Sequence, residues 1–195
     1  MSMIRLELIN YRPSLCDVSR RQCGFSLIEV MVALVVIAVG LLGIAGMQAL
    51  ALSNTNIART RSIATIEASS IAAAMQANPA YWSTGAVPAK LTVTGKVGAT
   101  WSATTLSNGA LNGQVSDCSS GPCTGIEMAA YDLKTWGQQL AKQIPGGKGV
   151  IACLLGVNNT VNCTITVNWS EKSVALNQAT QTGTSQQGIT LVVQP

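Results

Sequence analysis

Glu29 is a candidate functional residue, because its carboxylate lies at the start of an otherwise apolar stretch, residues 25–52. No charged residue occurs from Val30 to Leu52. A bare carboxylate inside a bilayer is energetically costly. It needs a cationic partner, or a position at the level of the lipid headgroups where it does nothing further. The residue by itself leaves both interpretations open.

The cysteines are the other reactive side chains, and the apolar stretch divides them. Cys16 and Cys23 precede it, and the others follow it in a region rich in serine, threonine, asparagine and glutamine. Four cysteines in a region that looks exported indicate two disulfides formed in an oxidising compartment. Their spacings do not match those of paired zinc ligands. The four are Cys118, Cys123, Cys153 and Cys163.

Catalytic chemistry is not indicated. The chain has no histidine, which removes the commonest general base and the commonest metal ligand. It has no glycine-rich phosphate loop after a strand and no pair of acids placed for catalysis. The net charge is only +4 and the lysines are scattered, which does not favour nucleic-acid binding. We therefore expect no enzyme, and no cofactor, metal, small-molecule substrate or nucleic acid.

The apolar stretch has the length of a membrane span. The 23 residues from Val30 to Leu52, at about 1.5 Å per helical residue, cross a hydrocarbon core roughly 30 Å thick. Arg20 and Arg21 lie shortly before it, and the positive-inside rule then places the N-terminus in the cytoplasm and the remaining chain in the periplasm. Two further arginines beyond its far end weaken this bias.

Two kinds of cleavage could act on this segment. A secretory signal peptide would be cut after it, at the A-x-A pattern of residues 49–51, but the apolar run is about twice the usual length and carries an acid. The second kind cuts before the run and leaves it attached. Residues 24–30, Gly-Phe-Ser-Leu-Ile-Glu-Val, resemble the prepilin cleavage and methylation motif of type IV pilins and type II secretion pseudopilins.

This resemblance implies cleavage after Gly24 by a prepilin peptidase, which makes residues 1–24 a leader, and N-methylation of Phe25. The cut creates a new amine at Phe25. Residues 25 and 29 are four apart and would share a helix face, so Glu29 could pair with its own amine or with that of a neighbouring subunit. The family implies the second pairing, which would favour assembly by neutralising both charges at low dielectric.

The apolar pattern continues beyond the membrane, which predicts one helix from residue 25 to about residue 77. Asn78-Pro79 ends it, because proline disfavours helix in the preceding residue. We expect a transmembrane half, residues 25–52, and an amphipathic half, residues 53–78. The stripe consists of Ile57, Ala64, Ile71 and Met75, flanked by Ile63 and Ile66. Three glycines, at positions 40, 43 and 46, could allow close helix approach or local melting.

Residues 79–195 are predicted to form a globular domain with an antiparallel sheet, so the fold class is α+β. Residues 80–125 are loop-like, with short strands at 90–93 and near Trp101. A second, amphipathic helix begins near Thr124, where Glu127 completes a capping-box spacing. Its buried face is predicted from Ile126, Ala130, Leu133, Trp136 or Gly137, Leu140 and Ile144, while Glu127 and Asp132 are assigned to its solvated face.

A β-hairpin follows, with strands 150–157 and 161–169 around Asn158. Opposed residues in a hairpin have a constant index sum, which places Cys153 opposite Cys163, close enough for a disulfide. We favour this pair, which leaves Cys118–Cys123 to close a tight loop, although the other connectivities stay open. A polar loop, residues 177–187, then leads to a third strand, residues 188–194.

The second half of the chain extends the resemblance to the minor pilins of the PilV family, the type IV pilus modification proteins. The similar residues are Asp117-Cys118, Cys123, Asp132-Leu133, Trp136, Leu140, Pro145 to Gly147, Cys153 and Val167-Asn168-Trp169.

This resemblance implies a structural subunit that promotes initiation and assembly of the pilus with other minor pilins and the major pilin, in twitching motility and adhesion. The subunit would lie in the inner membrane before assembly and in the pilus at the cell surface afterwards. Alternatives are a minor pseudopilin of type II secretion, or a tip adhesin or DNA-binding minor pilin.

Overall fold

The computed structural model describes residues 25–172 and 184–195. The predicted leader with Gly24, the cysteines at positions 16 and 23, and part of the predicted polar loop lie outside these residues. The helices are α1 (Leu27–Ala77), α2 (Pro79–Trp82), α3 (Gly109–Asn112), α4 (Gly125–Gln143) and the 3₁₀ helices η1 (Trp101–Ala103) and η2 (Val157–Asn159). The strands are β1 (Lys90–Thr94), β2 (Thr105–Leu106), β3 (Lys148–Leu155), β4 (Val161–Lys172) and β5 (Thr184–Val193).

The chain forms two compact units, Met1–Ala45 and Gly46–Pro195. The described part of the first unit is the beginning of α1, and all of its side chains are exposed. The second unit contains the rest of α1 and every other element. The α+β class is confirmed, and α1 ends at Ala77, directly before the Asn78-Pro79 pair.

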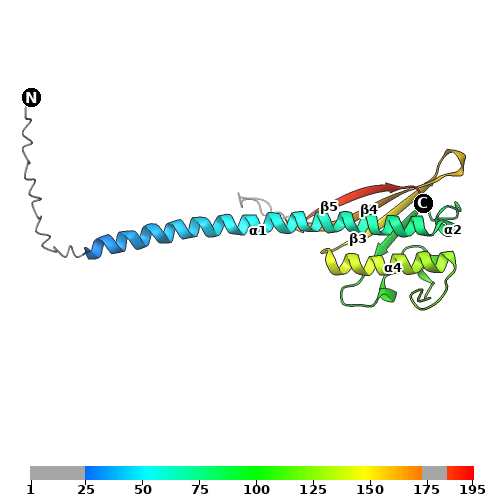
Figure 1. The fold of residues 1–195 in the computed structure, drawn as a ribbon, viewed down its shortest axis with the longest axis horizontal. Coiled ribbons are helices and arrows are strands. Elements are labelled where there is room, and N and C mark those ends of the chain that lie inside the picture. The colour runs from blue at the N-terminus through cyan, green and yellow to red at the C-terminus, as the bar shows by residue number, and fades with distance from the viewer. Residues whose placement is uncertain (1–24, 173–183) are drawn as a thin grey trace, which may run out of the picture. The chain divides into compact units, whose positions relative to one another are not determined.

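A five-stranded sheet in the order β2-β1-β3-β4-β5 organises the second unit (Figure 1). Every neighbouring pair is antiparallel. The β3–β4 hairpin has the predicted register, with Cys153 opposite Cys163. Its turn places Asn158 at φ 65° and Asn159 at φ 58°, a left-handed conformation in which asparagine is enriched.

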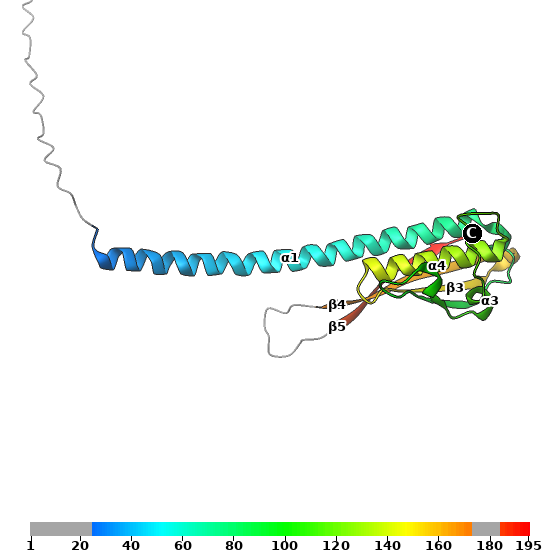
Figure 2. The ribbon, with the colours of Figure 1, turned by 90° about the horizontal axis from the view of Figure 1, so that it is seen from below.

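The second part of α1 and α4 lie on the same face of this sheet (Figures 1 and 2). Alanines on α1 let the helix pack closely, and larger side chains from α4 and the sheet fill the core. The buried members include Ala64, Ala68, Ile71, Ala72 and Met75 of α1, Leu133, Trp136 and Leu140 of α4, and Ile151, Ile165 and Val167 of the sheet. Ile66, predicted to flank the buried stripe, is instead 66% exposed.

Two glycines allow α4 to lie close to the strands. A Cβ on Gly149 would come within 2.2 Å of the Trp136 ring, and one on Gly137 would come within 2.6 Å of Val93 Cγ1. Either methyl group would push α4 off the sheet. This is a packing reason for glycine, because neither residue has a positive φ.

The segment between α1 and α4 contains more regular structure than the sequence predicts. β1 occupies the predicted strand at residues 90–93. Near Trp101 the predicted strand is β2, Thr105–Leu106, whereas Trp101 itself begins the 3₁₀ helix η1. The reason is tertiary, because the Trp101 ring packs edge-on against Tyr131 of α4, with ring centroids 5.1 Å apart. The last strand is also longer than predicted, since β5 includes residues 184–187 of the expected loop.

Candidate assembly site

The N-terminal motif leads into the first turn of α1. Phe25 and Ser26 precede the helix, and the Ser26 carbonyl oxygen accepts hydrogen bonds from the backbone N–H groups of Glu29 at 3.0 Å and Val30 at 3.3 Å. Phe25 is 81% exposed. Phe25 therefore precedes the helix in the intact chain, and its predicted pairing, which concerns the cleaved chain, stays a prediction. Its nitrogen lies in a peptide bond, and only cleavage would make it a cation.

No described residue covers the apolar beginning of α1. Every side chain from Phe25 to Ala49 is exposed. Among the described residues, α1 is the one helix long and apolar enough to cross a membrane. A helix that is apolar all round is stable only in lipid or packed against other protein. This surface therefore requires lipid or other protein chains to cover it.

Three glycines make shallow notches on the same helix. α1 continues without a break through Gly40, Gly43 and Gly46. A Cβ placed at any of them would meet no atom within 4 Å. The described part of the chain therefore gives no packing reason for glycine here, and lipid or another molecule could fill the notches.

The contact between α1 and α4 centres on Glu67, which is 5% exposed. Its Oε1 accepts a hydrogen bond from Gln143 Nε2 at 2.9 Å, and its backbone oxygen accepts one from Trp136 Nε1 at 2.9 Å. Its Oε2 has no partner among the described residues. Burial raises the pKa of Glu67, and the hydrogen bond from Gln143 opposes that rise. The sequence-based prediction missed this residue, although it lies three positions after Ala64 on the buried stripe.

Lys134 is a second buried charged residue, which the sequence analysis does not single out among the scattered lysines. It is 2% exposed, and its Nζ donates hydrogen bonds to the carbonyl oxygens of Asn112 and Gln114. Burial lowers the pKa of Lys134. The ammonium group thus links the end of α3 and the residues that follow it to α4. Its position four residues after the buried Ala130 was the available signal.

The start of α4 is fixed by hydrogen bonds to a carboxylate. Glu127 Oε2 accepts from the backbone N–H of Thr124 at 2.9 Å and from its hydroxyl at 2.7 Å, and Oε1 accepts from Ser116 Oγ at 2.6 Å. The bonds from Ser116 and Thr124 lower the pKa of Glu127 to about 2. The predicted capping-box spacing is confirmed. Glu127 and Asp132 are both of intermediate exposure, so they lie at the border of the predicted solvated face rather than fully on it.

Two disulfides brace the second unit. Cys153 is joined to Cys163 across the β3–β4 hairpin, and Cys118 is joined to Cys123 in the loop before α4. These are the pairings favoured from the hairpin register. No cluster of three or more metal-ligating side chains occurs among the described residues.

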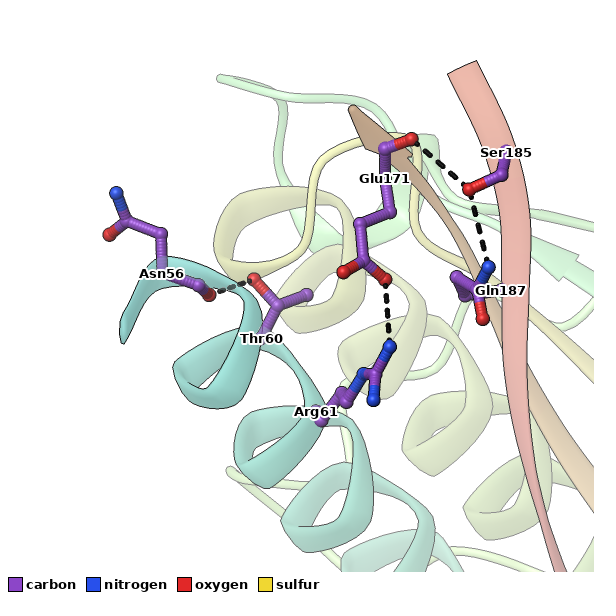
Figure 3. A network of polar contacts seen from close by, with 6 residues as sticks. All are labelled: Asn56, Thr60, Arg61, Glu171, Ser185 and Gln187. Atoms are coloured by element: carbon purple, nitrogen blue, oxygen red, sulfur yellow. Dashed lines mark hydrogen bonds and ion pairs between the residues drawn. The ribbon is translucent and has the colours of Figure 1, made fainter. Parts of the chain in front are cut away.

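A polar network links α1 to the ends of β4 and β5 (Figure 3). Arg61 Nη2 lies 3.5 Å from Glu171 Oε2, and Ser185 Oγ donates to the Glu171 backbone oxygen at 3.4 Å. Gln187 Nε2 donates to Ser185 Oγ at 3.2 Å. A cavity of about 380 Å³ lies beside this network, between α1 and Trp169. Within the second unit, the network joins α1 to the end of β4 through one partly exposed ion pair.

Comparisons with known proteins identify the N-terminal segment. Residues 19–45 match the family model of the prokaryotic N-terminal methylation motif. Comparisons with curated proteins and with solved structures gave no significant match. Because the matched motif is the signal of prepilin-type proteins, its place at the head of an exposed apolar helix supports a type IV pilin or pseudopilin, a structural subunit rather than an enzyme.

Proposed function

We propose that the chain is a minor pilin, a structural subunit that promotes initiation and assembly of a type IV pilus with other minor pilins and the major pilin. The observation that carries the proposal is the exposed apolar part of α1, with Glu29 in its first turn, inside the matched methylation motif. The similarity of residues 117–169 to the PilV family supports a minor pilin over other members of the class.

Maturation is the first proposed step. A prepilin peptidase would remove residues 1–24 and methylate the new amine of Phe25. Residues 25–52 would then hold the subunit in the inner membrane, with its N-terminus in the cytoplasm and residues 79–195 in the periplasm. On assembly the same apolar surface would leave lipid for contacts with other subunits, which conserves its burial.

Glu29 is the proposed assembly contact. Cleavage would convert the nitrogen of Phe25 into an amine that can be protonated, and Glu29 of one subunit would pair with Phe25 of its neighbour. Opposite charges attract strongly where water is excluded. Pairing between subunits removes two isolated charges from an apolar environment at once, so it favours assembly.

Gene deletion and complementation test this function in the native host. The proposal predicts loss of surface pili and of twitching, with type II secretion unaffected. Complementation with Glu29→Ala should restore neither pili nor twitching, whereas Gln48→Ala, a change at an exposed polar residue of the same helix, should restore both. Intact pili with failed secretion would instead assign the chain to a type II secretion system.

Maturation has its own measurement. Intact-mass spectrometry of the membrane-bound protein should give a chain that starts at N-methylated Phe25 and has lost four hydrogens through two disulfides. A chain that starts at Leu52 would mean removal of a signal peptide and would refute the proposal.

A further inference from the structure

β5 is the last strand of the sheet, and its outer edge has no neighbouring strand among the described residues. Its pairing with β4 is continuous from Cys163 opposite Val193 to Lys172 opposite Thr184, without a bulge. In an antiparallel pair, every second residue directs its N–H and C=O away from the partner strand. Over ten residues, β5 therefore presents a row of backbone donors and acceptors that no described element satisfies.

The sequence of β5 lacks the usual protection of an edge. Its ten residues, TSQQGITLVV, include no charged residue and no proline. Natural edge strands are commonly kept short, charged, bulged or interrupted by proline, because a long neutral edge pairs with other strands. The opposite edge, β2, has only two residues, Thr105–Leu106. The β2 edge is thus protected because it is short, whereas the long β5 edge has no such protection.

The core beneath β5 is incompletely covered. Leu191 pairs with Ile165, and Ile189 pairs with Val167. The two β4 residues are fully buried, whereas the two β5 residues on the same face are only half-buried. Val192, on the outer face, is 68% exposed. A strand added beside β5 would satisfy its backbone and cover both apolar side chains at once.

We infer that β5 is a docking edge for an extended segment of a different protein chain, which adds to the sheet as a sixth strand. The chemistry of the edge specifies this segment. It is uncharged, spans about ten residues to match β5, and carries apolar side chains at alternate positions to cover Ile189 and Leu191. Recognition comes from the backbone ladder and from those alternate side chains.

A second copy of this chain does not fit the edge. Two identical edges related by a two-fold axis form a regular ladder only when they are antiparallel. This reverses one copy, including the part of α1 in the second unit, along which β5 broadly runs (Figures 1 and 2). Under the proposed function, on which this step rests, both copies are anchored by the same end of α1 and must point the same way. β2 of another copy is too short to satisfy β5.

Amide hydrogen exchange on the full-length chain tests the docking edge. Exchange is compared between native membranes of the producing cells and the purified chain in detergent. We expect every second amide of β5 to exchange about tenfold or more slowly in native membranes, while the amides of α4 stay unchanged. Equal exchange of β5 in both states overturns the inference. Protection in detergent together with a dimeric mass would identify a second copy and overturn the choice of partner.

Ile189→Pro and Thr190→Pro form a matched pair of variants. Consecutive residues direct their N–H groups to opposite sides of a strand, and proline has none. One variant therefore loses a bond to β4 and has a lower Tm, and the other loses only an outward N–H and keeps its Tm. In native membranes, the outward amides of β5 in the stable variant should exchange about tenfold faster than those of the natural chain. Retained protection in that variant overturns the inference.

A second measurement separates the docking edge from the proposed function. Crosslinking through cysteines introduced on the apolar part of α1 reports whether the chain lies among pilin subunits. An assembled chain with unprotected β5 amides overturns the docking edge and leaves the proposed function standing. Protected β5 amides in a chain that never crosslinks to pilins support the docking edge and refute the proposed function.

Discussion

The substitution Glu67→Gln tests how the buried carboxyl group between α1 and α4 affects the stability of the chain. The Glu67 carboxyl group is 5% exposed, one of its oxygens accepts from Gln143 at 2.9 Å, and the other has no partner among the described residues. Glutamine has nearly the same shape, keeps an acceptor for Gln143 and removes the charge. We therefore expect the variant to be more stable than the natural chain at neutral pH.

The sign of the pH dependence follows from the raised pKa of Glu67, which burial causes. The folded chain holds this proton to a higher pH than the unfolded chain does. The contribution of Glu67 to stability is therefore fully present below the unfolded pKa of 4.5, and it is lost as the pH rises through the folded pKa. The glutamine variant has no such loss, so the two stability curves should separate with rising pH.

The size of the separation follows from the unpaired oxygen. A buried polar group without a partner costs about 1–3 kcal/mol. In the variant, the side-chain NH₂ group of the new glutamine would take the place of the unpaired oxygen, so part of this cost remains. A net gain of about 1 kcal/mol at neutral pH is therefore expected, which corresponds to a rise in Tm of about 3 °C for a unit of this size.

Urea unfolding of the full-length chain in detergent measures the effect, with tryptophan fluorescence as the signal. Trp136 reports directly, because its indole N–H bonds to the Glu67 backbone oxygen. Asp132, whose pKa burial also raises, is present in both chains and cancels in the difference. Glu171→Gln is the control, since its 3.5 Å ion pair with the half-exposed Arg61 should be worth less than about 1 kcal/mol. Parallel curves from pH 4.5 to 8, or a less stable Glu67→Gln chain at neutral pH, would refute the reasoning.

Three further predictions concern assembly and stability. When it is produced beside the natural chain, Glu29→Ala should insert in the membrane and be cleaved normally, but its ratio in sheared pili to that in membranes should fall below that of the natural chain, because the amine of Phe25 loses its partner. Lys134→Met should lower the free energy of unfolding in urea by about 3 kcal/mol, because two carbonyl oxygens lose a charged donor. Cys153→Ser combined with Cys163→Ser should lower it by about 2–3 kcal/mol in thermal unfolding, since the unfolded chain regains loop entropy.

Each of these predictions has an opposing outcome. Incorporation of Glu29→Ala into pili at the level of the natural chain would contradict the proposed pairing between subunits. A Lys134→Met chain as stable as the natural one would mean that the ammonium group adds nothing to the link between α3 and α4. If the double serine variant and the natural chain had the same Tm at the same detergent concentration, the disulfide would contribute nothing to the stability of the hairpin.

Features governed by neighbouring residues could be predicted from the sequence. The apolar run with its single acid, the helix stop at Asn78-Pro79, and the start of α4 at Thr124 with Glu127 all depend on residues a few positions apart. The hairpin register around Asn158 is local in the same way, and it places Cys153 opposite Cys163. In the candidate assembly site, the motif and the apolar surface of α1 were accessible to the same reasoning.

Contacts between distant residues were decided only by the tertiary structure. Glu67 and Lys134 are charged, and such residues are rarely buried without a partner; here α4 supplies Gln143 for Glu67, and the end of α3 with the residues after it supplies carbonyl oxygens for Lys134. Trp101 has strand propensity but forms a 3₁₀ turn, because its ring packs against α4. The unpaired edge of β5 also depends on the order of strands in the sheet. Burial and edge position are properties of the assembled chain, because they depend on which segments meet in space, and local spacing cannot specify that.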